Sequence, residues 1–247
     1  MALSRRQKAI IISLLVYWPV LFVLAHVPIP QLVREAGVSD KSLHFLAYLI
    51  LVFLLWFAIS SDKKVNWRSG TTWWILSVVV LYGVVDEFFQ PYVGRTRDAM
   101  DVAANVAGAL AGLVLFSVVS FWPAALLVAG TVIFGITNIA RASLADLLPV
   151  TNAMFHLFAY GIFTILWVQC TRLFSSTRPR NAKWLISAVA VPTLFLLAVK
   201  LCSAILGRDF TAADIIISVG AIAAVALTAY LTILRAKTQK TRDATQA

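Results

Sequence analysis

The sequence predicts an all-α, polytopic transmembrane bundle of about eight helices, arranged as two four-helix repeats. Hydrophobic residues make up 61% of the 247 residues and charged residues only 13%. The mean hydropathy is +0.87, far from the balance of a soluble globular domain. The apolar stretches are also about as long as the roughly 20 helical residues that cross a hydrocarbon core. Polar landmarks of the first half return in the second half, which indicates an internal repeat.

Eight apolar stretches are candidates for membrane spans. The first follows the basic segment Ser4-Arg5-Arg6-Gln7-Lys8, but it is too long for a signal peptide and lacks a small-x-small cleavage site, so we expect a retained helix. Cys170 and Cys202 fall in separate stretches, where packing is the expected role. The stretches lie roughly at residues 8–27, 42–60, 71–89, 101–121, 124–140, 153–173, 184–206 and 212–234, and the fifth is short.

The distribution of Lys and Arg predicts the orientation of the chain. One set of loops holds 14 of the 21 basic residues, with Asp62 and Asp243 as its acids. By the positive-inside rule, these loops and both termini are expected in the cytoplasm. The +10 net charge then serves topology and contact with anionic lipid, and we expect no nucleic-acid partner. The basic residues are Arg5, Arg6, Lys8, Lys63, Lys64, Arg68, Arg172, Arg178, Arg180, Lys183, Arg235, Lys237, Lys240 and Arg242.

The proposed repeat divides the chain into residues 1–121 and residues 122–247. DKSLHFLAY at 40–48 returns as NAMFHLFAY at 152–160, and Gly94-Arg95 followed by Asp101 returns as Gly207-Arg208 followed by Asp214. The second copy is degenerate, since Asp86-Glu87 corresponds to Val199-Lys200. We therefore expect any active site in the first half. We expect His156, which lacks nearby acids in its own half of the sequence, to be a helix-packing or hydrogen-bonding residue.

Polar residues line one face of three predicted helices in the first half. Asp40, His44 and Tyr48 are spaced i, i+4, i+8, Asp86 and Gln90 are four apart, and Asp101 and Asn105 are four apart, so each set shares a helix face. Gly108-x-x-x-Gly112 continues the last face, where small residues let a neighbouring helix approach closely. Ionisable groups at membrane depth are costly and are therefore candidates for function.

The cluster offers two kinds of chemistry. Carboxylates and an imidazole can bind a divalent metal or act as acid and base, and arginines can hold a phosphate or carboxylate. The catalytic candidates are His44, Asp86, Glu87 and Asp101, and the substrate-binding candidates are Lys41, Tyr48, Gln90, Arg95, Arg97 and Asn105. The metal and any other cofactor stay unknown, with Asp40, His44 and Glu87 as candidate ligands. A structural alternative is that these residues form internal ion pairs, Asp98 or Asp101 with Arg95 or Arg97 and Lys41 with Asp86 or Glu87.

The pattern from Asp40 to Gly108 resembles the signature of the VanZ-like family. The resemblance rests on Asp40-Lys41-x-x-His44-Phe45-x-x-Tyr48, Asp86-Glu87-x-x-Gln90 and Gly94-Arg95 with Asp101-Val102-x-x-Asn105-x-x-Gly108. It implies a bacterial membrane protein of the cell envelope, which we expect in the cytoplasmic (inner) membrane. The founding member of the family lends resistance to teicoplanin without remodelling of the peptidoglycan precursor.

Three functions remain open at this point. The first is recognition or processing of an amphiphile or lipid-linked glycan at the outer leaflet, with membrane lipid and a glycopeptide-related ligand as expected partners. The second is an intramembrane hydrolase or transferase acting on a phosphorylated lipid head group, and whether the protein is an enzyme is left open. The third is a transporter or flippase with two rocking halves, whose sites usually lie at the midplane.

Overall fold

The computed structural model describes residues 3–26, 40–139, 149–174, 182–207 and 211–246, and these are helical apart from short turns and connections. Eight helices in these ranges are long and apolar enough to cross a membrane. The predicted all-α bundle of about eight helices long enough to cross a membrane is thereby confirmed. The chain forms two compact units, Met1–Ala142 and Ser143–Ala247.

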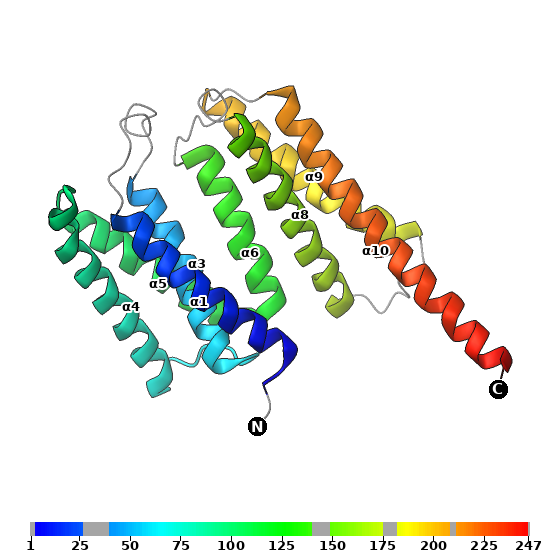
Figure 1. Cartoon of the computed structure of the whole chain (residues 1–247), viewed down its shortest axis with the longest axis horizontal. Coiled ribbons are helices and arrows are strands. Elements are labelled where there is room, and N and C mark those ends of the chain that lie inside the picture. Colours follow the sequence, from blue (N-terminus) through cyan, green and yellow to red (C-terminus); the bar gives the residue numbers. More distant parts are fainter. Residues whose placement is uncertain (1–2, 27–39, 140–148, 175–181, 208–210, 247) are drawn as a thin grey trace. The chain divides into compact units, whose positions relative to one another are not determined.

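Each unit is a bundle of long helices (Figure 1). Within the described ranges, the first unit contains the helices α1 (Arg5–His26), α3 (Asp40–Ser60), α4 (Gly70–Phe89), α5 (Ala99–Val118) and α6 (Phe121–Phe134). The 3₁₀ turn η1 (Gln90–Val93) follows α4, and the π-helical turn η2 (Gly135–Ile139) extends α6. The second unit contains α8 (Pro149–Phe174), α9 (Ala182–Ile205) and α10 (Ala212–Gln246).

Helix α3 forms the centre of the first unit. It packs against α1, α4, α5 and α6, and 61% of its most apolar window is buried, compared with 11% for α1. Phe53 and Phe57 of α3 stack with Phe116 of α5 and Phe121 of α6 at centroid separations of 5.1–5.7 Å. Edge-to-face and tilted aromatic pairs of this kind add to the energy of apolar burial. They hold the C-terminal half of α3 in place.

Two glycines bring α5 against α3, as their spacing predicts. A Cβ added at Gly108 would lie 2.2 Å from the backbone oxygen of Phe45, and one added at Gly112 would lie 2.5 Å from Val52 Cγ1. Only a residue without a side chain permits the approach at Gly108, because its obstacle is backbone. The contact lies one turn below the polar ends of both helices, and it therefore sets the distance between their polar side chains.

Helix α6 belongs to the first unit by its packing. It contacts α3 and α5, so this compact unit extends to Ala142, whereas the expected boundary between the repeats lies at residue 121. The second unit buries Val168, Trp184, Ala188 and Ala226 in its own core. The repeat itself stays a prediction.

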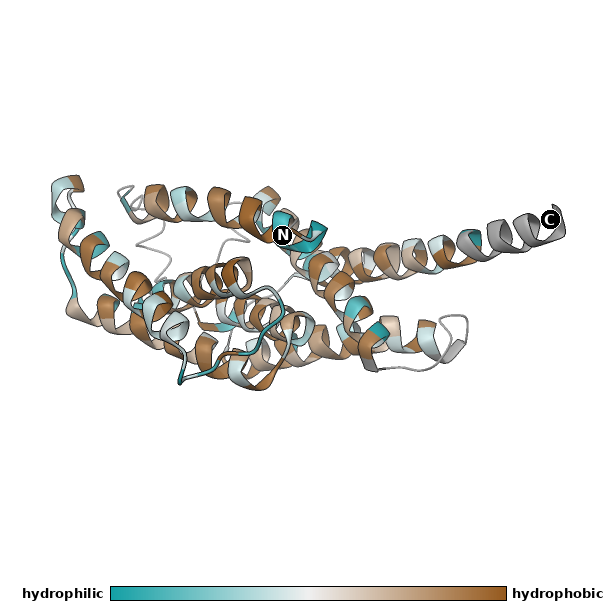
Figure 2. Cartoon of the chain, turned by 90° about the horizontal axis from the view of Figure 1, so that it is seen from below, coloured by the Kyte–Doolittle hydropathy of each residue, from teal (hydrophilic) through white to brown (hydrophobic). Residues whose placement is uncertain are grey.

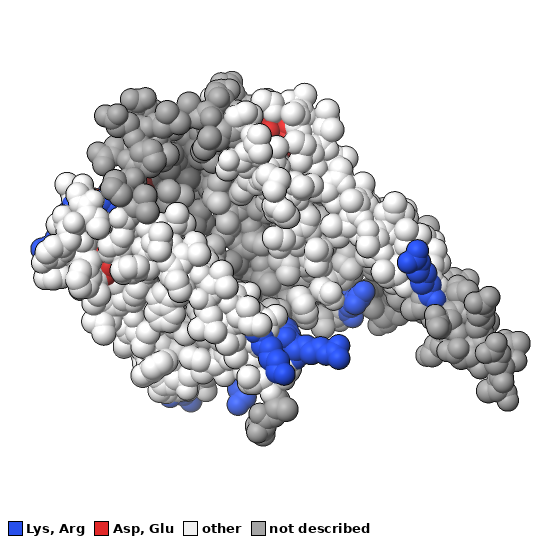
Figure 3. Space-filling view, viewed as in Figure 1, with Lys and Arg blue, Asp and Glu red and all other residues white. Residues whose placement is uncertain are grey.

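The polar residues of the first unit lie near its two ends. Figure 2 shows apolar residues along the helices and hydrophilic residues concentrated near helix ends and connections. Figure 3 shows Lys and Arg gathered near the N-terminus. Here Arg6 contacts Asp62, and Gln7 Nε2 donates to the Ala58 carbonyl at 3.0 Å, so the start of α1 and the α3–α4 loop share one end. We call this the basic end, formed by Arg5, Arg6, Lys8, Lys63, Lys64 and Arg68.

Replacing Gly108 by Ala should disrupt the first unit. The new methyl group meets the α3 backbone, which cannot move aside without separating the helices, and overpacking of this kind costs about 1–3 kcal/mol. We expect a lower melting temperature and a lower yield of monodisperse protein in detergent.

Gly220→Ala is the matched control, because nothing lies within 4 Å of an added Cβ there. A helical Gly→Ala change in open space should stabilise by up to about 1 kcal/mol. Equal melting temperatures of the two variants would contradict the close approach at Gly108.

Candidate polar site in the first unit

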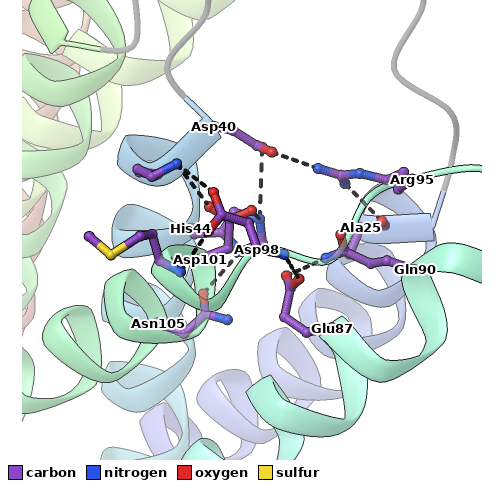
Figure 4. A network of polar contacts seen from close by, with 11 residues as sticks. Ala25, Asp40, His44, Glu87, Gln90, Arg95, Asp98, Asp101 and Asn105 are labelled. Atoms are coloured by element: carbon purple, nitrogen blue, oxygen red, sulfur yellow. Dashed lines mark hydrogen bonds and ion pairs between the residues drawn. The ribbon is translucent and has the colours of Figure 1, made fainter.

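A cluster of polar side chains lies at the end of the first unit where α3 and α5 begin and α4 finishes, opposite the basic end (Figure 4). Its members come from three helices and the connection between α4 and α5, and most are buried. We call this set the polar cluster: Asp40, Lys41, His44, Asp86, Glu87, Gln90, Arg95, Asp98, Asp101 and Asn105.

The connection from α4 to α5 places both acids and bases in the cluster. After the 3₁₀ turn, Gly94 adopts φ 78°, the left-handed conformation that glycine accepts without strain, and the Arg95 amide donates to the Gln90 carbonyl at 3.1 Å. Asp98 then caps α5 by accepting from the Met100 amide at 2.8 Å. The Asp98 amide donates to Glu87 Oε2 at 3.3 Å. Glu87 therefore joins the end of α4 to the start of α5.

His44 lies between two carboxylates and an amide. Its Nδ1 is 3.0 Å from Asn105 Oδ1, and because a carbonyl oxygen can only accept, Nδ1 carries the proton. Its Nε2 is 3.8 Å from Asp40 Oδ1 and 3.7 Å from Asp101 Oδ2, which is too long for a hydrogen bond. In the neutral ring, Nε2 thus presents its lone pair towards two acids.

The two cationic side chains of the cluster are already paired with acids. Arg95 donates to Asp40 Oδ2 and to the Ala25 carbonyl, both at 2.8 Å, and so holds the end of α1 to the start of α3. Lys41 Nζ donates to Asp98 Oδ2 at 2.7 Å and lies 3.8 Å from Asp101 Oδ1. This ammonium holds the pKa of the Asp98 carboxyl below its usual value, with help from the Met100 amide.

Ion pairs therefore exist, but with other partners than the structural alternative proposed. Arg95 binds Asp40 rather than Asp98 or Asp101, and Lys41 binds Asp98 rather than Asp86 or Glu87.

Two candidates for substrate binding lie away from this network. Arg97 donates to the Phe88 carbonyl at 3.1 Å and stacks over the Phe88 ring at 4.5 Å, so it is directed at α4. Tyr48 is buried a turn below His44, where its ring stacks on Tyr82 at 6.0 Å.

Two residues outside the predicted site list belong to its surroundings. Asp98 contacts Lys41, Glu87 and Met100. Its position just before the apolar run of α5 is typical of an N-cap residue, so this role could have been predicted from the sequence. His26 ends α1 with Nδ1 donating to the Phe22 carbonyl at 2.8 Å and lying 3.6 Å from Asp86 Oδ1. Nothing in its local sequence indicated this contact, since α1 and α4 meet only in the folded unit.

Several buried oxygens of the cluster accept no hydrogen bond from the described residues. They are Asp86 Oδ1, Gln90 Oε1 and Asp101 Oδ1, while two unpaired donors, Asn105 Nδ2 and Tyr48 Oη, lie deeper. Buried polar atoms are normally paired. Among the described residues, three carboxylate and amide oxygens of the cluster thus remain unpaired, and so do the neighbouring ring nitrogen His26 Nε2 and the hydroxyl of Tyr82.

The residues that could hold a metal differ in one member from the expected set. Asp40, His44 and Asp101 each offer a ligand atom, and these atoms lie within 4.8 Å of one another. The third candidate from the sequence, Glu87, is instead engaged by the Asp98 amide and by Gln90 Nε2. Asp101 reaches His44 because α5 and α3 approach closely at Gly108.

The second unit holds a related polar cluster of its own. His156 Nε2 lies 3.6 Å from Asp214 Oδ2, so the expectation that His156 has no acid nearby is wrong. Its Nδ1 lies 3.2 Å from Ser218 Oγ, as that of His44 lies near Asn105. Asp214 is bound by Asn152 Nδ2 at 2.7 Å and by Lys200 Nζ at 3.3 Å. Arg208 of the predicted repeat lies outside the described residues.

The comparisons with known proteins identify the first half of the chain. Residues 6–120 match the model of the VanZ/LLP1 family, and this range contains every residue of the polar cluster. No curated protein and no solved structure matches the chain.

Replacing Arg95 by Lys should loosen the end of α1. A single ammonium cannot reproduce the two guanidinium contacts to Ala25 and Asp40, and hydrogen bonds that involve a charged group contribute about 1.5–3 kcal/mol each. We expect a lower melting temperature and faster amide hydrogen exchange in the last turn of α1.

Arg97→Lys provides the control, because Arg97 bonds to one carbonyl on the surface of α4. Surface changes of this kind usually stay within about 0.5 kcal/mol. If both variants melt alike, the Arg95 link does not hold α1 to the cluster.

Proposed function

The chain is a VanZ-like integral membrane protein, and from that premise we propose that its polar cluster binds or processes the head group of an amphiphilic or lipid-linked substrate of the bacterial cell envelope. The substrate reaches the cluster from the outer leaflet of the cytoplasmic membrane. In the family context, this activity lowers susceptibility to a glycopeptide of the teicoplanin type.

The orientation follows from the two ends of the first unit. The basic end carries six Lys and Arg residues, listed above, and the positive-inside rule assigns such an end to the cytoplasm. The polar cluster at the opposite end of α3 then faces outward, and both chain termini lie inside. A head group at the outer interface is at the depth of the first two turns of α3 and α5.

Apolar side chains beside the cluster support an amphiphile as the ligand. Phe89, Tyr92 and Met100 are 46%, 75% and 58% exposed, and they flank the polar residues of the α4–α5 connection. An acyl or prenyl chain can lie along such residues in the bilayer while its polar head reaches the buried acids.

The observation that carries the proposal is the joining of three helices by one polar network. His44 of α3 lies 3.7 Å from Asp101 of α5, and Glu87 of α4 contacts the Asp98 amide at the start of α5. The network lies in the outermost turns of the helices. A transporter site is usually near the midplane, so this location favours binding or processing of a substrate over transport.

A hydrolase or transferase acting on a phosphorylated lipid head group is the second candidate. His44 favours it, because Nδ1 is fixed by Asn105 and Nε2 has its lone pair available as a base. Arg95 would then exchange Asp40 for a phosphate oxygen, since its guanidinium can bind either anion in bidentate fashion.

Replacing Glu87 by Gln in the native host tests the function. The glutamine side chain has the shape of glutamate but no negative charge. Its NH₂ group would face another donor, either the backbone amide of Asp98 or Nε2 of Gln90. We expect the envelope lipid and precursor profile, and the susceptibility to teicoplanin, to shift towards those of a deletion strain.

Asp62→Asn is the control, because it removes a carboxylate at the basic end. It should leave the profile unchanged at equal protein levels in the membrane. A Glu87→Gln strain that matches wild type in both readouts would rule out a role for the Glu87 charge.

A further inference from the structure

We propose that Asp40, His44 and Asp101 bind a divalent transition-metal ion of the zinc or manganese class. The inference deepens the proposed function and rests on it for the use of the ion. The contacts among the described residues of the cluster support the site by themselves.

The distances fit three ligands around a shared ion. His44 Nε2 lies 3.8 Å from Asp40 Oδ1 and 3.7 Å from Asp101 Oδ2, and one ligand atom of each residue falls within 4.8 Å of the others. Ligands at about 2.1 Å from a tetrahedral ion are about 3.4 Å apart. The three groups are thus too far apart to bond to one another, and small side-chain movements bring them to an ion.

The donor types and their orientation fit the same class of ion. One imidazole with two carboxylates is a ligand set that suits zinc and manganese rather than a soft ion. Asn105 fixes the His44 tautomer by accepting from Nδ1, which leaves Nε2 as the ligand atom. A hydrogen bond from the second ring nitrogen is the usual support of a metal-bound histidine.

The negative charge of the buried carboxylates also favours binding of a cation. Five carboxylates face two cationic side chains, Lys41 and Arg95, among the described members, and both cations are paired already. Asp101 is only 3% exposed, and its Oδ1 has no hydrogen-bond partner in the described ranges. The ammonium of Lys41 lies 3.8 Å from this oxygen but donates its hydrogen bond to Asp98, so two carboxylates share one positive charge. Burying anions with incomplete compensation is costly, and an ion beside Asp101 supplies the remaining charge.

In the second unit, a lysine side chain compensates the buried aspartate. In the sequence correspondence, His156 matches His44, Asp214 matches Asp101 and Lys200 matches Glu87. Lys200 Nζ binds Asp214 Oδ2 at 3.3 Å, and that oxygen lies 3.6 Å from His156 Nε2. A built-in cation therefore stands beside the His–Asp pair of the second unit.

Two residues that donate hydrogen bonds to the aspartate in the second unit correspond to carboxylates, which only accept, in the first unit. Asn152 and Lys200 both donate to Asp214, whereas their counterparts are Asp40 and Glu87. Since the His–Asp geometry is alike in both units, the difference lies in where the cation comes from. In the first unit it comes from solution, and it leaves an open coordination position for a phosphate or carboxylate oxygen of a head group.

Metal titration of the purified full chain tests the site without any substrate. The protein, carrying a tag without histidine, is stripped with a chelator in detergent and titrated with Zn²⁺ and Mn²⁺ by calorimetry, with elemental analysis after desalting. We expect one ion per chain for wild type and a rise in melting temperature on loading. Asp101→Asn and His44→Gln should each weaken binding about tenfold or more.

Two variants keep the test interpretable. His156→Gln removes the matching imidazole of the second unit and should bind the ion as wild type does. Asp40→Asn alters the half-exposed ligand at the start of α3, so it should weaken binding even if the buried variants fail to fold. Wild type that binds no ion at neutral pH, or binding unchanged in Asp40→Asn and either buried variant, would overturn the site. Failure of the Glu87→Gln test with intact metal binding would overturn the proposed function alone.

Discussion

The close approach of α5 to α3 at Gly108 is the constraint on which the rest of the first unit depends. The backbone oxygen of Phe45 lies where a Cβ of any other residue would be, so the two helices meet backbone to backbone. One turn above this contact, His44 comes between Asn105 and Asp101. The polar cluster is therefore a consequence of helix packing, since no single helix brings these groups together.

Among the described residues, that packing gathers five carboxylates around two cationic side chains, Lys41 and Arg95. Arg95 and Lys41 are held by Asp40 and Asp98, and Asp101 has one oxygen without a hydrogen-bond partner in the described part of the chain. Such an arrangement costs stability, which proteins tolerate where function needs it. In the second unit, Lys200 and His156 both lie beside Asp214, so a comparable His–Asp pair has a lysine as its partner.

Much of the fold was predictable because its signals are local. Eight apolar stretches, their limits and the glycine spacing on α5 are properties of single segments, and each was found where the sequence indicated. That Asp40, His44 and Asp101 lie in one cluster was also predictable from their helix faces. The partner of each charge was not, because Arg95 and Arg97 are two residues apart and only the turn at Gly94 directs one to Asp40 and the other to Phe88. The contact of His26 with Asp86 likewise depends on how α1 packs.

We propose that the first unit keeps its surplus carboxylates for function rather than for stability. The most direct test is Glu87→Lys, which gives the first unit the lysine that the second unit has at Lys200. The melting temperature in the presence of a chelator and the envelope profile of the host are measured together. The lysine adds a cation beside the acids but loses the two hydrogen bonds that Glu87 accepts, so we expect a variant that still folds and has the envelope profile of a deletion strain. A folded variant that keeps the wild-type profile would contradict this proposal.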